Sequence, residues 1–288
     1  MKFSIVTPSL NQLPCLRQCV FSVADQCGAE VEHIVIDGGS TDGTIAWLEK
    51  SAEQLSADRY QLSFVSEPDE GIYDALNKGF TRSSGGVFAW LNCDEQYLTG
   101  TLQKVAGFFE TQPEADFVYG DVLLIDPEGK LLTCRKNPPL RRAYVLADHL
   151  YTQSAAMFFR AGIFSSGVRF DTAWKAVGDC AFVVRALEAG FHSTQIRDYL
   201  SVCTMTGQNV SRGRAGVEEL KSFRRQVPMR FQLGRPVLNG LRYLEKFIRG
   251  GYRAETSLTY ELYSDGFRIR KKMISEKAGC RFRWEAHD

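Results

Sequence analysis

Residues 33–43 read His-Ile-Val-Ile-Asp-Gly-Gly-Ser-Thr-Asp-Gly, an apolar strand-like run that ends in carboxylates and glycines. The pattern recurs at residues 61–71, Gln-Leu-Ser-Phe-Val-Ser-Glu-Pro-Asp-Glu-Gly, and at residues 87–95, Val-Phe-Ala-Trp-Leu-Asn-Cys-Asp-Glu. In an open α/β sheet, ligands bind at the carboxyl ends of the strands. Three acidic strand ends in succession therefore indicate a site for a hydroxyl-rich ligand or a divalent metal rather than three ordinary turns.

Strand-like and helix-like patterns alternate along the first hundred residues. Continuous apolar runs predict buried strands, and apolar spacings of three and four predict helices. The expected strands are 3–7, 31–36, 62–65 and 87–91, and the expected helices are 11–24, 45–50 and 72–80. Thr41 or Asp42 is expected to cap the second helix. This alternation predicts βαβ units and an α/β fold with a mostly parallel central sheet.

The second half of the chain has a different pattern. A turn at residues 126–129 separates two strand-like runs, 116–125 and 130–134, which predicts a β-hairpin beside the main sheet. A strand is expected at 153–159 and a helix at 179–189, which Gly190 ends. After about Gly207, Arg-rich helical patterns replace the strand signals. We therefore expect one domain over residues 1–207 and a basic, mainly helical extension over residues 208–288.

The charge is distributed unevenly. The formal net charge of the 288-residue chain is +1, but the segment from Arg212 to the end carries 18 basic and 9 acidic residues. Residues 1–211 are therefore acidic overall, which suits metal coordination, and the basic C-terminal segment suits an anionic surface. The eight cysteines lack zinc spacing, and neither a signal peptide nor a membrane span is indicated. We therefore expect free thiols and a cytoplasmic protein.

Together these motifs resemble family 2 glycosyltransferases. The resemblance rests on residues 4–9 (Ser-Ile-Val-Thr-Pro-Ser), 37–44, 66–79 (Ser-Glu-Pro-Asp-Glu-Gly-Ile-Tyr-Asp-Ala-Leu-Asn-Lys-Gly) and 91–95, which occur in the family's order and at its intervals. It covers roughly residues 2–200 and is strongest to bacterial enzymes of surface-polysaccharide assembly. It implies a GT-A fold, a nucleotide-sugar donor, and inverting transfer to a saccharide or lipid-linked acceptor.

The resemblance implies nucleotide-binding roles at three strand ends. Thr7, Pro8 and Ser9 would line the nucleotide pocket with backbone and small polar groups. Asp37 would accept the imide hydrogen of uracil; taken alone, it suits the turn that follows it equally well. Asp69 matches the family position that approaches the uridine and ribose. A uridine-linked donor is therefore expected.

Three polar residues share one face at the start of the third expected helix. Asp74, Asn77 and Lys78 are three and four residues apart, and a helix N-terminus favours anions. The functional interpretation puts one or more of them on the donor side of the site. The alternative is a surface ion pair between Asp74 and Lys78.

Asn92-Cys93-Asp94-Glu95 occupies the place of the Asp-x-Asp metal motif of the resembling family. The resemblance implies Asp94 as a ligand of Mn²⁺ or Mg²⁺, with Asn92 and Cys93 beside the donor and Glu95 as a neighbour. Hard cations prefer oxygen ligands, and the metal would neutralise the leaving diphosphate. Because Asn92 replaces an acid, the metal should bind weakly without nucleotide.

Inverting transfer needs a base that takes the proton of the acceptor hydroxyl. Asp179 matches the second residue of the acidic pair that supplies this base in the family, whereas Gly178 replaces the first. Asp179 also suits the N-cap of the helix that follows it. Trp174 is interpreted as either a sugar-stacking residue or a core tryptophan.

The extension contains a basic amphipathic helix. Its apolar residues are Val237, Leu238, Leu241, Leu244, Phe247 and Ile248, and Arg235, Arg242, Lys246 and Arg249 lie among them. Such a helix lies on the anionic inner face of the plasma membrane, or packs on its own domain or on a second subunit of a homodimer. No nucleic-acid module is recognised, so no nucleic-acid partner is expected.

The expected function is therefore a metal-dependent glycosyltransferase, with two rivals. A nucleotidyltransferase should show a Gly-rich loop with a basic residue near the N-terminus, where residues 7–11 read Thr-Pro-Ser-Leu-Asn. A catalytically inactive nucleotide-sugar-binding protein stays open because Asn92 and Gly178 replace acids. Slow hydrolysis of the donor in the presence of metal would separate an enzyme from a binding protein.

Overall fold

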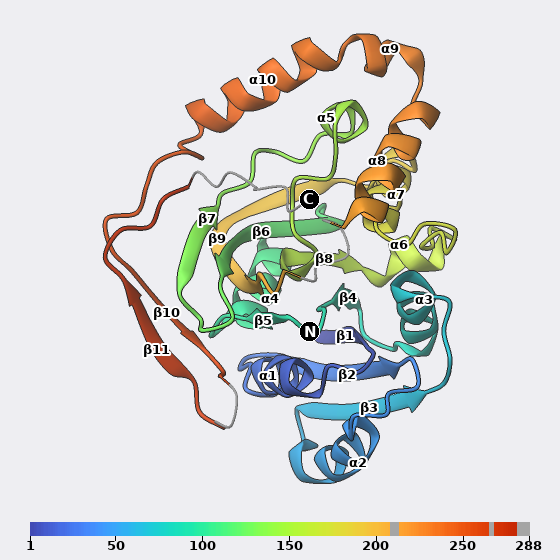
Figure 1. The fold of residues 1–288 in the computed structure, drawn as a ribbon, viewed down its shortest axis with the longest axis vertical. Helices are drawn as coiled ribbons and strands as arrows, with labels where there is room; N and C mark the ends of the chain where they lie inside the picture. The colour runs from blue at the N-terminus through green and yellow to red at the C-terminus, as the bar shows by residue number, and fades with distance from the viewer. Residues whose placement is uncertain (208–212, 265–267, 281–288) are drawn as a thin grey trace.

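The computed structural model describes residues 1–207, 213–264 and 268–280. Residues 208–212, 265–267 and 281–288, which belong to the expected extension, lie outside the described residues. A twisted sheet runs through the middle of the molecule, and an arch of helices, followed by a long β-hairpin, wraps around its C-terminal half (Figure 1).

The N-terminal half follows the predicted alternation. Its elements are β1 (Lys2–Ser9), α1 (Leu13–Ala24), β2 (Glu30–Asp37), α2 (Thr44–Leu55), β3 (Tyr60–Ser66), α3 (Ile72–Arg82) and β4 (Val87–Trp90). The four strands are parallel and lie in the order β3-β2-β1-β4. Ser9 pairs with Asp37, and Asp37 pairs with Ser66, so these strands end at the same level. The acidic strand ends therefore gather at one edge of the sheet.

The C-terminal half of the sheet mixes parallel and antiparallel pairs. Its elements are β5 (Glu95–Tyr97), α4 (Thr101–Thr111), β6 (Phe117–Ile125), β7 (Leu131–Arg135), α5 (Arg142–Ala147), η1 (Ser154–Ala156), β8 (Met157–Arg160), α6 (Ala161–Ser165), α7 (Gly178–Glu188) and β9 (Ser193–Thr204). In the described residues the sheet has nine strands, in the order β3-β2-β1-β4-β8-β6-β9-β5, with β7 also on β6. Parallel pairings account for most of its length.

Two expectations for this half need correction. The hairpin β6–β7 forms, but β6 is a central strand between β8 and β9 rather than an element beside the sheet. All nine residues of β6 are buried, as expected of a central strand and not of a hairpin with one solvated face. The strand expected at 153–159 begins with a 3₁₀ turn, in which the Ser154 hydroxyl turns to donate to Glu95.

The expected caps also differ. The N-cap of α2 is Gly43, whose φ of 92° is readily adopted by glycine. Asp42 instead accepts the amides of Thr44 at 3.2 Å and of Leu13 at 2.9 Å, so it ties the starts of α1 and α2 together. Val177, not Asp179, is the N-cap of α7.

Two apolar layers hold the helices on opposite faces of the sheet. One layer packs α1, α2 and α4 against the sheet. The other lies under α3, α5, α6 and α7 and is rich in aromatic side chains, with Phe170 and Phe182 stacked at a centroid distance of 4.3 Å. Because aromatic side chains bury large areas in specific geometries, this second layer fixes the positions of α3 and α7, the helices that carry Tyr73 and Asp179.

The extension begins with α8 (Arg214–Gln226), α9 (Met229–Leu233) and α10 (Arg235–Ile248), the helices of the arch (Figure 1). It continues with an antiparallel hairpin that the sequence analysis does not predict, β10 (Leu258–Leu262) and β11 (Lys271–Ser275). Buried side chains of β10 pack against Leu123 and Ile125 of the main sheet. Among the described residues, no helix has the length and apolar character needed to cross a membrane.

Candidate active site

The two hydroxyl side chains at the end of β1, Thr7 and Ser9, differ in their hydrogen bonding. Thr7 is fully buried, and its hydroxyl shares a hydrogen bond of 2.9 Å with Nε2 of His33. Burial lowers the pKa of His33 to about 3, so this ring is neutral. The Ser9 hydroxyl is buried beside Cys93, with which it interacts electrostatically, but it makes no hydrogen bond of normal geometry to a described residue. Of these two hydroxyls, Ser9 is therefore the one that fits a ligand at the sheet edge.

Pro8 and Cys93 join β1 to the loop after β4. The Cys93 thiol donates to the carbonyl oxygen of Pro8 at 3.1 Å. Burial raises the pKa of Cys93 well above its ordinary value, so the sulfur stays protonated. Because metals bind the thiolate form, Cys93 holds the two strand ends together and is unsuited to bind the metal.

Asp37 is the most enclosed of the predicted site residues. Its side chain is fully buried, and its Oδ2 accepts the amides of Gly39 and Ser40 and the hydroxyl of Ser66 at 2.7 to 3.0 Å. Its Oδ1 accepts the Ser40 hydroxyl. A carboxylate offers about four accepting positions, so these bonds leave little capacity for a uracil ring. The geometry favours the turn interpretation of Asp37.

Asp69 retains an oxygen that faces the same loop. Its Oδ1 accepts the amide of Gly71 at 2.8 Å. Its Oδ2 lies against Gly38, where an added Cβ would come within 2.9 Å of it. Asp69 therefore lies beside the Asp37 turn, and its Oδ2 accepts no hydrogen bond from the Gly71 amide that Oδ1 binds. It is better placed than Asp37 to accept a hydrogen from a ligand.

The polar residues of α3 brace loops. Lys78 pairs with Asp74 at 3.0 Å and with Glu67 at 3.4 Å, so it ties α3 to the loop after β3. Asn77 forms two hydrogen bonds with the backbone of Phe170, at 2.9 and 3.0 Å. The contact between Asp74 and Lys78 is the ion pair of the alternative interpretation. Asn77 has a structural role, because it binds the backbone of Phe170, a residue far away in the sequence.

The Asn92–Glu95 turn contains a buried amide oxygen that accepts no hydrogen bond from a described residue, and a buried carboxyl group. Glu95 accepts the Asn92 amide at 2.8 Å and the Ser154 hydroxyl at 3.2 Å. Burial and the charge of Asp94 raise the pKa of Glu95 to about 8, so it is largely protonated at neutral pH. The side-chain Oδ1 of Asn92 is buried, and no described residue satisfies it.

The oxygen atoms of this turn fit a hard divalent cation. Asp94 offers a partly exposed carboxylate, and Asn92 offers its unsatisfied Oδ1. Mg²⁺ and Mn²⁺ prefer such ligands and complete their shells with water and phosphate oxygens. Among the described residues, no group of three His, Cys, Asp or Glu side chains could hold a metal unaided. The donor set therefore fits a cation that binds together with a diphosphate.

Asp179 lies in the first turn of α7 opposite Tyr73 of α3. Its Oδ1 accepts the Cys180 amide at 2.7 Å and the Tyr73 hydroxyl at 3.4 Å. Burial raises the pKa of Asp179 to about 6, close to the value that suits a base at neutral pH. A Cβ on Gly178 would lie 2.6 Å from the Tyr73 ring. The ring thus explains why glycine, and not a second acid, precedes Asp179.

Glu219 of α8 is a residue that the sequence analysis misses. Its carboxylate accepts the three successive amides of residues 175–177, at 2.5 to 2.9 Å, just before Asp179. Trp174 packs edge-on against Phe223 of α8 at 5.9 Å and belongs to the aromatic layer, which favours the core interpretation. No local motif announces Glu219, because its partners are backbone amides more than forty residues away.

Residues 4–166 match the sequence profile described as Glycosyl transferase family 2. A "PGL/p-HBAD biosynthesis glycosyltransferase" of Mycobacterium bovis (strain BCG / Pasteur 1173P2) is 28% identical over 236 residues, which cover 81% of this chain and 86% of that protein.

Two solved structures share the fold. S. aureus TarS in complex with UDP-GlcNAc aligns with a TM-score of 0.62 at 16% identity, covering 94% of this chain and 99% of that one. The mannosyltransferase PcManGT from Pyrobaculum calidifontis in complex with GDP-Man and Mn²⁺ aligns with a TM-score of 0.58 at 17% identity, covering 84% and 69%. The α/β sheet is thus that of GT-A glycosyltransferases. Because the family profile matches more than half of the sequence, the chain belongs to glycosyl transferase family 2.

Proposed function

We propose that the protein is a metal-dependent, inverting glycosyltransferase that moves a sugar from a uridine-linked donor to a saccharide or lipid-linked acceptor. One observation carries the proposal. Trp90, which ends β4 just before the Asn92–Asp94 turn, packs edge-on against Phe182 of α7, the helix that carries Asp179, at 6.1 Å. This contact joins the turn, with the unsatisfied Asn92 oxygen, to the helix whose Asp179 has a raised pKa. Buried polar atoms without partners are rare in folded proteins and often belong to ligand sites.

Asp94 and Asn92 would hold the metal. When bound, a divalent cation neutralises the charge that develops on the departing diphosphate. The Ser9 hydroxyl would bind the nucleotide at the neighbouring strand end. PcManGT was crystallised with Mn²⁺, and we extend a cation of this kind to the present chain.

Asp179 would act as the base. As the acceptor hydroxyl attacks the anomeric carbon, its proton passes to the Asp179 carboxylate. The bond between the anomeric carbon and the diphosphate breaks on the opposite face of that carbon, so the configuration is inverted. Tyr73 would position the carboxylate through its hydroxyl. Glu219 would hold the preceding loop.

Uracil is the proposed base of the donor, and Asp69 would accept its imide hydrogen. TarS structures contain UDP or UDP-GlcNAc, whereas PcManGT contains GDP-Man, so the fold accommodates either kind of base. The free oxygen of Asp69 fits the imide hydrogen of uracil. We further propose that the enzyme acts in bacterial surface-polysaccharide assembly. Its catalytic domain would end near residue 207.

The proposal is tested by binding and turnover on the purified chain. UDP with Mn²⁺ should raise the melting temperature more than GDP or ADP, because a ligand of the native state stabilises it. UDP-sugars should then release UDP slowly in water and faster with acceptor. Release of pyrophosphate from a nucleoside triphosphate and a sugar phosphate would instead identify a nucleotidyltransferase, and binding without turnover would identify an inactive binding protein.

A further inference from the structure

Helix α10 packs against the protein with its polar face. Arg242 is only 4% exposed and donates to Asp148 at 3.0 Å, and Glu245 accepts a hydrogen bond from Arg141 at 2.8 Å. The opposite face is apolar and open, whereas a surface helix normally buries its apolar face. The exposed fractions are 66% for Val237, 47% for Leu241, 54% for Leu244, 70% for Phe247 and 73% for Ile248.

Helix α9 extends this face. Met229 and Leu233 are 71% and 77% exposed. The hydrogen bond from the Leu238 amide to Gly234 carries the helical path from α9 into α10. Spacings of three or four place Met229, Leu233, Val237, Leu241, Leu244 and Ile248 on one continuous stripe. We call the exposed apolar residues of α9 and α10 the arch face. A contiguous apolar surface of this length marks an interaction site.

The surroundings of the arch face are basic. Residues 214–249 include nine Arg or Lys and three Asp or Glu. Two of the three acids are used inside the protein, Glu219 by the loop before α7 and Glu245 by Arg141. Arg225, Arg230 and Arg249 are exposed at the ends of the helices. The charge beside the apolar stripe is therefore of one sign.

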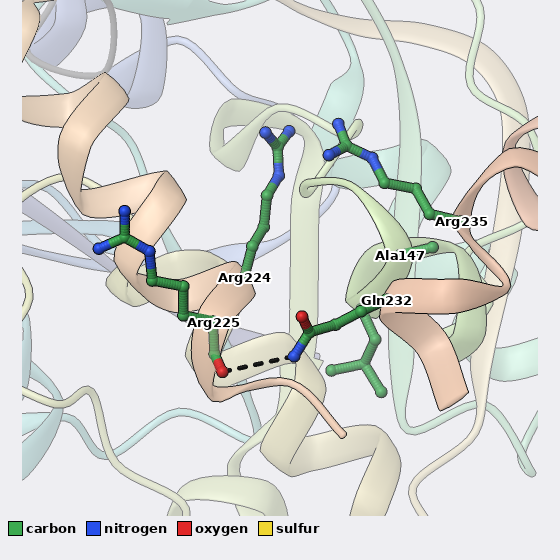
Figure 2. Close-up of a pocket in the computed structure, with 6 residues that line it drawn as sticks. Ala147, Arg224, Arg225, Gln232 and Arg235 are labelled. Atoms are coloured by element: carbon green, nitrogen blue, oxygen red, sulfur yellow. Dashed lines mark hydrogen bonds between the residues drawn. The ribbon is translucent and has the colours of Figure 1, made fainter. Parts of the chain in front are cut away.

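A basic pocket lies under the arch. It has a volume of about 210 Å³ and lies between α5 and the arch, lined by Leu146, Ala147, Arg224, Arg225, Gln232 and Arg235 (Figure 2). The Asp148 carboxylate forms ion pairs with Arg224, Arg235 and Arg242, with N–O distances of 2.7 to 3.0 Å. One carboxylate cannot neutralise three guanidinium groups, so the pocket retains an excess of positive charge that suits a phosphate.

We propose that the arch face docks on an anionic lipid bilayer. The apolar stripe would enter the boundary between headgroups and acyl chains, and the arginines and the pocket would contact lipid phosphates. A second copy of the chain is a poorer occupant, because a two-fold contact would set the basic surroundings of one arch face against the equally basic surroundings of the other. This surface goes beyond the proposed function, since vesicle binding requires no turnover.

The test is sedimentation of the full chain with vesicles. Vesicles of equal parts phosphatidylcholine and phosphatidylglycerol should carry the protein down, and pure phosphatidylcholine should carry much less. The variant Val237→Ser/Phe247→Ser should bind at least about tenfold more weakly, because two inserted apolar side chains are lost. The matched control Ile269→Ser/Ile274→Ser removes side chains that are 79% and 66% exposed on the hairpin segment, and should bind as the wild type does.

The basic part is tested separately. Arg225→Gln/Arg230→Gln should weaken binding to the mixed vesicles by about fivefold per arginine and leave binding to neutral vesicles unchanged. Equal binding of the wild type to both vesicle types would overturn the anionic requirement. Light scattering that shows a dimer, converted to a monomer by Val237→Ser/Phe247→Ser, would assign the arch face to a second copy. Absence of vesicle binding would overturn the proposal.

Discussion

At the scale of single residues, the environment of Asp179 bears most directly on the chemistry. Burial raises its pKa to about 6, so the carboxylate predominates at neutral pH and still accepts a proton readily. We expect Asp179→Asn to lower the transfer rate by about 10²–10⁴-fold, the usual contribution of a general base. Steady-state rates with saturating donor, together with the donor affinity from calorimetry, would measure this effect.

The same substitution has an expected sign for stability. A carboxyl whose pKa is higher in the folded than in the unfolded protein stabilises the fold at low pH, and this stabilisation is lost as pH rises through about 6. Asp179→Asn should therefore melt no lower than the wild type at pH 8. The wild-type rate should fall as pH drops below about 6, as the base protonates. A stable variant with near-normal transfer would leave Asp179 with a structural role only.

A second residue-scale prediction concerns Asp94. Asp94→Ala should abolish metal-dependent turnover and leave the melting temperature of the free protein nearly unchanged, because the side chain is only partly buried. Titration of Mn²⁺ in the presence of UDP would measure the lost affinity. Glu70→Ala, which removes an exposed acid from the loop after β3, is the control. Wild-type activity of Asp94→Ala with Mn²⁺ would show that the metal assignment is wrong.

Asp37 and Asp69 provide a matched pair. Asp37→Asn should lower the melting temperature, because the new amide group places a donor among the amides and hydroxyls that Asp37 now accepts. Asp69→Asn should keep the melting temperature and weaken UDP binding relative to GDP. Calorimetry and thermal denaturation on both variants distinguish these effects. Tighter binding of GDP than of UDP by the wild type would contradict the uridine proposal.

At the scale of elements, the start of α7 depends on α8. Glu219→Gln should speed hydrogen exchange at the amides of residues 175–177 and reduce transfer, since hydrogen bonds to a charged group contribute about 1.5–3 kcal/mol each. Glu218→Gln is a closely matched control, because Glu218 is the adjacent residue and pairs with Lys221 on the surface. Equal exchange in the two variants would contradict a role for Glu219 in holding the loop.

The alternation of the first four strands could be predicted from the sequence because each strand is a short apolar run that ends in a turn signal. The family motifs placed Asp94 and Asp179 for the same reason, since both follow recognisable local patterns. Strand β9 and hairpin β10–β11 were not predicted. The run Leu258-Thr259-Tyr260-Glu261-Leu262 does alternate with period two, but the partner that buries it, the far end of β6, is distant in sequence.

Residue roles inside the site were harder to predict than residue positions. Asp37 lies at a strand end as expected, and its bonds to Ser40 and Ser66 favour the turn interpretation. Asn77 lies on the expected helix face, but its partner is the Phe170 backbone. In each case the deciding contact joins segments that only the folded chain brings together.

At the scale of the whole molecule, the inverted packing of α10 could not be predicted from its amphipathic pattern. The pattern correctly identifies a helix with an apolar stripe, and the usual expectation is that this stripe faces the core. Here a buried acid, Asp148, attracts the polar face of α10 instead, through Arg235 and Arg242, and it also pairs with Arg224 of α8. The arch is therefore held by these ion pairs together with apolar contacts of Phe223 and Leu238, and the exposed apolar residues of α9 and α10 remain outward.

The ion pairs of Asp148 should control whether α10 stays docked on the protein. Removal of one partner of a buried ion pair costs about 3–5 kcal/mol, because the other charge stays buried and unpaired. Asp148→Asn would leave the buried Arg242 without its carboxylate, so we expect the arch to open while the sheet stays folded. Hydrogen exchange should speed up along α10 and remain slow in β1 and β2. Asp171→Asn, which breaks a half-exposed pair with Arg185 on α7, is the control and should leave α10 protected.

Acid should have the same effect as the substitution. Burial would raise the pKa of Asp148, but the hydrogen bond and charge of His149 and the charges of Arg242 and Arg224 outweigh it and hold the pKa well below its usual range. A carboxyl of this kind stabilises the fold fully above about pH 4, and the stabilisation is lost as pH falls toward the lowered value. Exchange along α10 should therefore speed up below about pH 4 in the wild type and be much less pH-dependent in Asp148→Asn, after correction for the intrinsic exchange rate. Uniform loss of protection in β1 and α10 would instead mean that arch and sheet unfold as one unit.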